Sequence, residues 1–169
     1  MVALATGISG LAFGIYEHFN KPKYGYVVLT EVFADFQMKK EVQTKHEMEM
    51  SAPQRYLDSM AFVLQNESYR LDSMKDAPQA DIDAYLMKRE KFLSQRQQFE
   101  QNMQSRTAEL DKQIIDRMTQ YIKDYGTQNG YTFIYGDDGN GNIMYADGTT
   151  NVTAEVINYL NSRYSGQSK

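Results

Sequence analysis

The chain has 169 residues, no cysteine, two histidines and a net charge of −4. The absence of cysteine excludes disulfides, thiol catalysis and thiolate metal sites, and the acidic balance gives no reason to expect nucleic acid as a partner. One ordinary domain is the first expectation for this length.

Residues 2–16 form an uncharged apolar run. The run lacks the basic start and the small-residue cleavage site of a secretory signal, and it is a little short for a membrane-spanning helix. Three interpretations stay open: an uncleaved membrane anchor, the remnant of a signal peptide, or a buried helix. The first two place the rest of the chain outside the cytoplasm. Pro22 ends this N-terminal segment (residues 1–22), because the residue before a proline is disfavoured in a helix.

Residues 24–29 are rich in β-formers and predict the first strand. Thr30 then stands where an N-cap would precede a helix that begins at Glu31. Pro53 falls inside this predicted helix. Ser51 could cap a helix that restarts there, and a local kink is the simpler alternative, because proline removes one backbone donor.

Pro78 marks a turn over residues 75–81 and divides a long helical region in two. The predicted helices, 31–75 and 81–125, have 45 residues each, so each would reach roughly 65–70 Å. Globular helices average about a dozen residues. We therefore predict an antiparallel helical hairpin, the arm (residues 36–119, with its tip near 75–81), rather than a packed layer.

A heptad-like apolar stripe runs along both predicted helices and is typical of a coiled-coil pair. Glu67, Arg96 and Arg106 interrupt this seam, and charges on residues 36–118 nearly balance, with 13 basic and 14 acidic side chains. The stripe suffices for a helix pair but not for a globular core. Its expected members are Leu57, Met60, Leu64, Leu71, Met74, Leu86, Leu93, Phe92, Phe99, Met103 and Leu110.

The C-terminal third predicts compact structure. Gly126 is the expected stop of the second long helix. Residues 131–136 predict a strand, residues 137–142 ("DDGNGN") a hairpin turn, and residues 143–146 the returning strand. Thr153 is the expected N-cap of a last helix, with Glu155 in its first turn and an apolar face at Val156, Ile157 and Leu160.

Three short strands and one short helix, from residues 23–35 and 120–169, form the predicted body. A body of about 75 residues buries too little apolar surface to be stable as a monomer. Three strands also leave unpaired sheet edges. We therefore expect an oligomer whose copies pool their strands.

Catalytic and metal-binding patterns are missing from the sequence. The 137–142 loop has the alternating Asp and Asn of a calcium loop, but Ile143 and Thr149 stand where that loop needs Gly and Glu. Its glycines form neither a dinucleotide fingerprint nor a P-loop. We expect no enzyme activity, no cofactor and no metal.

Two segments carry a resemblance to a known family: "YGYVVLTEVFADFQMKKE" (residues 24–41) and "YIKDYGTQNGYTFIYGDDGNGNIMYADGTTNVTAEVINYLN" (residues 121–161). In these segments the chain resembles the Skp/OmpH family of periplasmic chaperones. They cover about a third of the chain, and the arm agrees mainly in length and pattern.

The resemblance implies an α+β fold: a small β-barrel body formed by trimerisation, with a long antiparallel coiled-coil hairpin, or tentacle, per subunit. It also implies a homotrimer that holds unfolded outer-membrane proteins in a cavity between the arms without ATP. Well-known members are strongly basic whereas this chain is acidic, so apolar contacts would carry more of the capture. An N-terminal anchor would tether this copy to the inner membrane, facing the periplasm.

The expected client-binding residues of the arm are apolar, although each could instead belong to the seam: Met60, Leu64, Met74, Tyr85, Phe92, Phe99 and Met103. The expected core and trimer interface of the body comprises Tyr26, Val28, Phe133, Ile134, Tyr135, Ile143 and Met144. Two alternative functions remain: a membrane-tethered coiled-coil adaptor of the cell envelope that binds one folded partner through its tip, and a cytosolic prefoldin-like clamp.

Overall fold

A computed structural model describes residues 22–166 of the chain. The predicted N-terminal anchor or signal lies outside the described residues. The chain divides into two compact units. The first, the body, comprises the described residues up to Phe36 and those from Arg117 onward; the second, the arm, is Gln37–Asp116.

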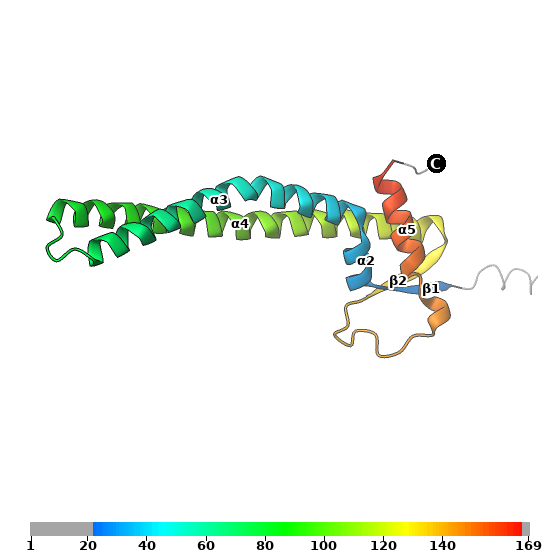
Figure 1. Ribbon diagram of the computed structural model, residues 1–169. Coiled ribbons are helices and arrows are strands. Elements are labelled where there is room, and N and C mark those ends of the chain that lie inside the picture. Colours follow the sequence, from blue (N-terminus) through cyan, green and yellow to red (C-terminus); the bar gives the residue numbers. More distant parts are fainter. Residues whose placement is uncertain (1–21, 167–169) are drawn as a thin grey trace, which may run out of the picture. The chain divides into compact units, whose positions relative to one another are not determined.

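The arm consists of two long helices, α3 (Gln37–Asp72) and α4 (Gln79–Gln128), and the last turns of α4 belong to the body. Figure 1 shows α3 and α4 side by side as an antiparallel hairpin. The turn between them holds Pro78, directly before α4, as the sequence predicts. The predicted restart at Ser51 is wrong, because α3 continues through Pro53 and the Ser51 hydroxyl donates to the carbonyl of Met48 at 2.8 Å.

The first long helix does not run unbroken from Glu31. A short helix α2 (Leu29–Asp35) precedes it, and Phe36 between α2 and α3 is extended, with φ −67° and ψ 118°. The break turns the Phe36 ring into the body, where it packs edge-on against Tyr121 and Tyr164 at centroid distances of 6.2 and 5.9 Å. The predicted Thr30 cap is also wrong, because α2 already begins at Leu29.

The body contains a two-stranded parallel sheet of β1 (Lys23–Val28) and β2 (Tyr131–Asp137). Both strands were predicted, but their pairing was not. The register places Tyr24 opposite Phe133 and Tyr26 opposite Tyr135. Parallel strands need a long crossover between them, and here α2, α3 and α4 together form that connection.

The predicted hairpin and third strand are corrected by this pairing. Residues 143–146 form no strand, and β2 pairs with β1 instead. The turn chemistry was read correctly: Gly139 and Gly141 have positive φ, and Asp137 and Asp138 accept backbone N–H bonds within the loop. The Gly/Asp/Asn loop therefore reverses the chain, but the residues after it form no strand that pairs with β2.

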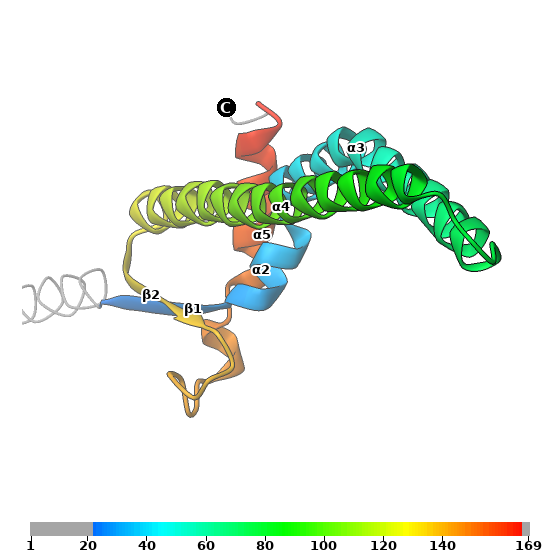
Figure 2. The same ribbon diagram turned by 90° about the vertical axis from the view of Figure 1, so that its left-hand side faces the viewer.

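The last helix, α5 (Thr153–Tyr164), covers the sheet together with α2. Both views place these helices on one side of the strands and residues 138–150 on the other (Figures 1 and 2). Thr153 is not the N-cap: its hydroxyl donates to Asn151 and accepts the Val28 amide at 3.0 Å. It joins the end of β1 to the start of α5.

The core of the body lies between the sheet and these two helices. Its fully buried side chains come from β1, α2, the α2–α3 break and α5, and they are Val27, Val32, Phe36, Val156 and Leu160. The Val152 amide also donates to the Tyr26 carbonyl at 2.9 Å, so α5 is anchored along β1 by its first residues.

Gly126 is not the stop of α4, because α4 continues to Gln128 and Gly130 follows with φ +69°. Gly126 has a packing role instead. A Cβ placed there would lie 3.3 Å from Cδ1 of Ile134, which is tight contact. The sequence pattern predicted that Gly126 ends α4, whereas the structure shows that its lack of a side chain permits close packing against Ile134.

Candidate functional site

The arm buries few side chains. On α3 only His46, Leu57 and Leu64 are buried, and on the arm part of α4 only Ile114. Leu57 and Leu64 confirm the predicted seven-residue spacing of the seam. Leu86 and Leu93 do not, since both were expected in the seam and are 49% and 47% exposed. The seam is thinner than predicted.

Two ion pairs join the helices near the tip. Lys88 on α4 pairs with Glu67 on α3, and Arg70 on α3 lies 3.4 Å from Asp81 on α4. Glu67 therefore interrupts the apolar stripe but still serves the helix pair, because its carboxylate reaches across the seam. Such partly exposed pairs contribute little stability, about 0–1 kcal/mol each.

The arm surface, as we call it, consists of large apolar side chains of the arm that are at least 39% exposed. Tyr56 and Val63 are seven residues apart, as are Phe62 and Tyr69, so each pair shares a helix face outside the seam. The stretch from residue 50 to 66 carries only two charges, at Arg55 and Asp58. The members are Met48, Tyr56, Phe62, Val63, Tyr69, Met74, Leu86, Met87, Leu93 and Ile115.

The residues predicted to bind clients lie mostly at the seam. Leu64 is buried, Met74 is 39% exposed, and the others are half-buried: Met60, Tyr85, Phe92, Phe99 and Met103. Tyr56, Phe62, Val63 and Tyr69 were missed. A second heptad pattern, offset by one residue from Leu57 and Leu64, was the signal that could have identified Tyr56 and Val63.

A second apolar surface, the sheet face, lies on the body. The ring of Tyr24 stacks on that of Phe133 at 6.1 Å, and Phe133 stacks on Tyr135 at 5.8 Å. These three rings are 49–54% exposed, and Met144 and Tyr145 are 90% and 85% exposed. A folded monomer rarely leaves a group of stacked aromatic rings exposed to solvent.

The predicted body residues are therefore divided between the sheet face and less exposed positions. Phe133, Tyr135 and Met144 belong to the sheet face. Tyr26, Val28, Ile134 and Ile143 are half-buried. Tyr24, Tyr26, Tyr135, Ile143 and Met144 line a cavity of about 500 Å³ on this side of the body.

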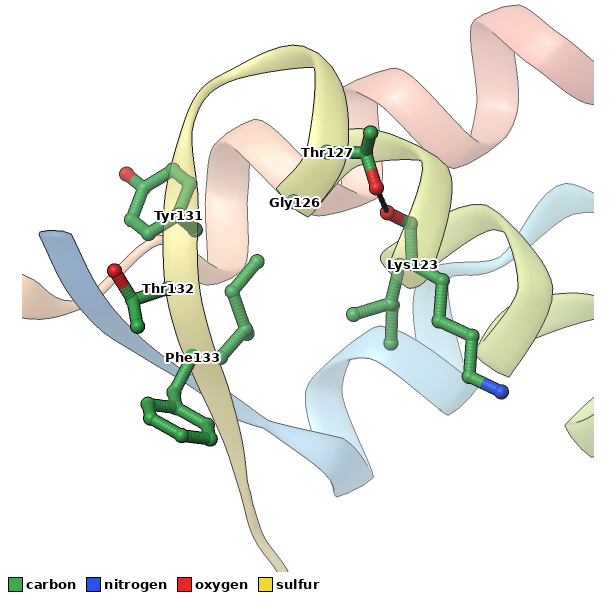
Figure 3. A pocket seen from close by; sticks show the side chains of 8 residues that line it. Lys123, Gly126, Thr127, Tyr131, Thr132 and Phe133 are labelled. Carbon is green, nitrogen blue, oxygen red and sulfur yellow. Dashed lines mark hydrogen bonds between the residues drawn. The ribbon is translucent and has the colours of Figure 1, made fainter. Parts of the chain in front are cut away.

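Figure 3 shows another pocket of the body, about 420 Å³, between the last turns of α4 and β2. Its lining includes Lys123, Gly126 and Thr127 of α4 and Tyr131 and Phe133 of β2. The Thr127 hydroxyl donates to the Lys123 carbonyl at 2.9 Å, so its polar group is already used within the helix. The pocket offers mainly shape and apolar surface.

Tyrosines gather behind the sheet as well. The Tyr125 ring contacts Tyr131 at 5.8 Å and Tyr159 at 5.5 Å. Burial, together with the neighbouring Tyr131, raises the pKa of the Tyr125 phenol to about 12. This cluster is a packing feature, since a phenol that stays protonated is no general base at neutral pH.

No metal-binding cluster is assembled within residues 22–166. These residues contain no group of three His, Asp or Glu side chains that could hold a metal ion. Hydrogen bonds from Asn140 lower the pKa of Asp138, and those from Thr149 lower that of Asp147, so both carboxylates are engaged within their own loop. No helix of the described part is long and apolar enough to cross a membrane.

Comparison with known proteins places the chain in a family. The model of the family described as outer membrane protein (OmpH-like) matches residues 23–160. The match covers both the body and the arm, so the chain belongs to the OmpH-like family, which is a family of chaperones. This confirms the resemblance that the sequence suggested.

A solved structure shares the fold. It is a protein from Caulobacter crescentus CB15 assigned as an outer membrane chaperone (OmpH-like), with a TM-score of 0.59 and 12% sequence identity. The similarity covers 85% of this chain and 86% of that one. Among curated proteins, none matches this chain.

Proposed function

We propose that this protein is an ATP-independent holdase chaperone that binds unfolded outer-membrane proteins and prevents their aggregation in the periplasm. The observation that carries the proposal is the arm surface. Tyr56, Phe62, Val63 and Tyr69 are 49–65% exposed on one helix, although a folded monomer usually hides such a concentration of apolar groups. Family membership supports a chaperone role for it.

The physical basis is many weak contacts. Full burial of one large apolar side chain is worth about 1.5–3 kcal/mol, so partial contact with a mobile client contributes about a few tenths to 1 kcal/mol per residue. Unfolded barrel strands expose alternate apolar side chains that can exchange among such sites. Methionines such as Met48 and Met87 suit this use, because their flexible side chains adapt to different partners.

The client-binding set proposed here extends the sequence-based one. The exposed members of the arm surface make first contact, and the half-buried rings of Tyr85, Phe92 and Phe99 border them at the seam. Nearly balanced charge on the arm means that apolar contact, rather than long-range attraction, holds the client. Binding should then depend only weakly on salt.

We further propose a homotrimer built through the sheet face. Three copies would cover Tyr24, Phe133, Tyr135 and Met144 and would satisfy strand edges that a two-stranded sheet leaves open. A closed barrel has no free edges. In this arrangement the arms of three subunits enclose the client, with no nucleotide, metal or enzymatic step, and an N-terminal anchor could hold the trimer at the inner membrane.

The test is light scattering of a urea-unfolded outer-membrane barrel protein, diluted into buffer that contains the full chain and no nucleotide. We expect scattering to be suppressed near one trimer per client. A variant with Tyr56, Phe62, Val63 and Tyr69 all changed to Ser should lose most of this suppression. The matched control changes four exposed polar residues of the same helix to Ser: Gln43, Gln54, Gln65 and Asn66.

Two outcomes would overturn the proposal. If the folded wild-type chain leaves aggregation unchanged, the coiled-coil adaptor becomes the better hypothesis, and a folded envelope partner should be sought. If the control variant loses suppression as fully as the apolar variant, the arm surface is not the client-binding surface.

A further inference from the structure

One interruption of the seam of the arm lies at Pro53 of α3. Leu57 and Leu64 are buried seven residues apart on α3, and His46 is buried farther toward the N-terminus. Residues four apart on a helix share a face, so Pro53 occupies a seam position four residues before Leu57. Pro53 is nevertheless exposed. Pro53 therefore contributes no buried side chain to the seam at this level.

The backbone of α3 is weakened at the same level. Pro53 lies inside the helix and has no N–H, so the Glu49 carbonyl cannot receive its usual helical hydrogen bond. Just before it, the Ser51 hydroxyl donates to the Met48 carbonyl at 2.8 Å. Side-chain bonds of this kind often bend helices. Two perturbations thus fall within six residues of α3.

Interactions that hold the helices together lie to either side. Toward the tip, Leu64 is buried and Glu67 pairs with Lys88. Toward the other end, His46 and Ile114 are buried together at one cavity of about 340 Å³. Opposite Pro53, α4 is an uninterrupted helix without proline.

We propose that Pro53 is a hinge in α3, which lets the part of the arm beyond it bend relative to the part before it. The missing backbone bond, the Ser51 side-chain bond and the exposed position of Pro53 favour bending at this level of α3, while α4 accommodates it by gentle curvature, as long helices do. Figure 2 shows α3 following a curved path beside α4. This inference concerns the arm itself and does not require the proposed client.

The test measures distances between pairs of spin labels. The chain has no cysteine, so introduced cysteines are labelled uniquely. Lys45→Cys and Asn66→Cys, both at exposed positions, flank Pro53 and are 21 positions apart, about 31 Å along a straight helix. Lys91→Cys and Lys112→Cys have the same separation on α4 and serve as the matched pair. Labelled chain is diluted with excess unlabelled chain.

We expect the distance distribution across Pro53 to be at least twice as wide as that of the α4 pair. Pro53→Ala should narrow it to the width of the α4 pair, because alanine restores the donor and favours helix. Ser59→Ala, an exposed α3 change away from the hinge, should leave it wide. Equal widths for wild type and Pro53→Ala would overturn the proposal.

Hydrogen exchange provides an independent measurement. In the wild type, amides of residues 50–57 should exchange at least tenfold faster than those of residues 60–67. Pro53→Ala should remove the difference. Uniform protection along wild-type α3 would also overturn the hinge.

Discussion

The body and the arm bury apolar surface in opposite ways. In the body, five side chains from four segments are fully buried within one small core, whereas the arm buries single residues at intervals along a thin seam. The body leaves its apolar excess on one sheet face, but the arm distributes it along much of its length. The difference shows that a packed core stabilises the body, whereas the arm keeps many of its large apolar side chains exposed to solvent.

The largest expected effect comes from truncating a core residue of the body. Leu160→Ala should lower the free energy of unfolding by about 2–5 kcal/mol, because Leu160 is completely buried and leaves a cavity. Leu57→Ala in the arm should cost about 1–2 kcal/mol, since its site can close more easily. Urea denaturation of both variants measures the contrast. Equal losses would mean that the arm is packed as tightly as the body.

A smaller effect concerns Tyr125 at alkaline pH. The folded pKa of about 12 lies above the ordinary value of 10.0, so the folded state favours the protonated phenol. The resulting stability is fully present below pH 10 and is lost as the pH rises from 10 to 12, by about 2–3 kcal/mol.

Denaturation curves between pH 8 and 12 check this expectation. Tyr125→Phe should flatten the decline, because that ring cannot ionise. An arm substitution such as Tyr56→Phe, at an exposed ring, should not. A Tyr125→Phe curve that falls as steeply as the wild-type curve would contradict the assignment.

The smallest expected effect lies at the seam of the arm. His46 is 9% exposed, and neither ring nitrogen has a hydrogen-bond partner among the described residues. A buried polar group without a partner costs about 1–3 kcal/mol. His46→Leu should therefore stabilise the arm by about 1 kcal/mol once repacking is included, measured as a rise in thermal midpoint. His46→Ala, which removes the same polar group but leaves a cavity, should not.

Much of the fold could be predicted from local pattern. Pro78 and the heptads identified the hairpin, and β-rich runs identified β1 and β2 to within one residue at most ends. These elements depend on interactions between near neighbours in the chain. The candidate site was only partly predictable, because periodicity finds apolar stripes but does not say which stripe faces the partner helix. Leu86 and Leu93 were therefore assigned to the seam, and Tyr56 and Val63 were overlooked.

Strand pairing required the tertiary structure. Residues 131–146 read locally as an antiparallel hairpin, because a turn-forming loop separates two β-rich runs. The long crossover through α4 instead places β2 alongside β1, and residues 143–146 pair with no strand among residues 22–166. Phe36 likewise breaks a helix that local propensity would continue, since its ring is completely buried in the body core.

The sequence alone determined the hairpin of long helices, its turn, the strands β1 and β2 and the family, because helix and strand propensity, periodicity and turn signals are local. Only the tertiary structure decided the parallel register, the end of α4 past Gly126 and the division of apolar residues between seam and surface. The last two outcomes depend on packing between α4 and β2, as at Gly126 and Ile134, and between α3 and α4. The register depends on contacts between residues more than a hundred positions apart, such as Tyr26 with Tyr135. No local pattern encodes such contacts.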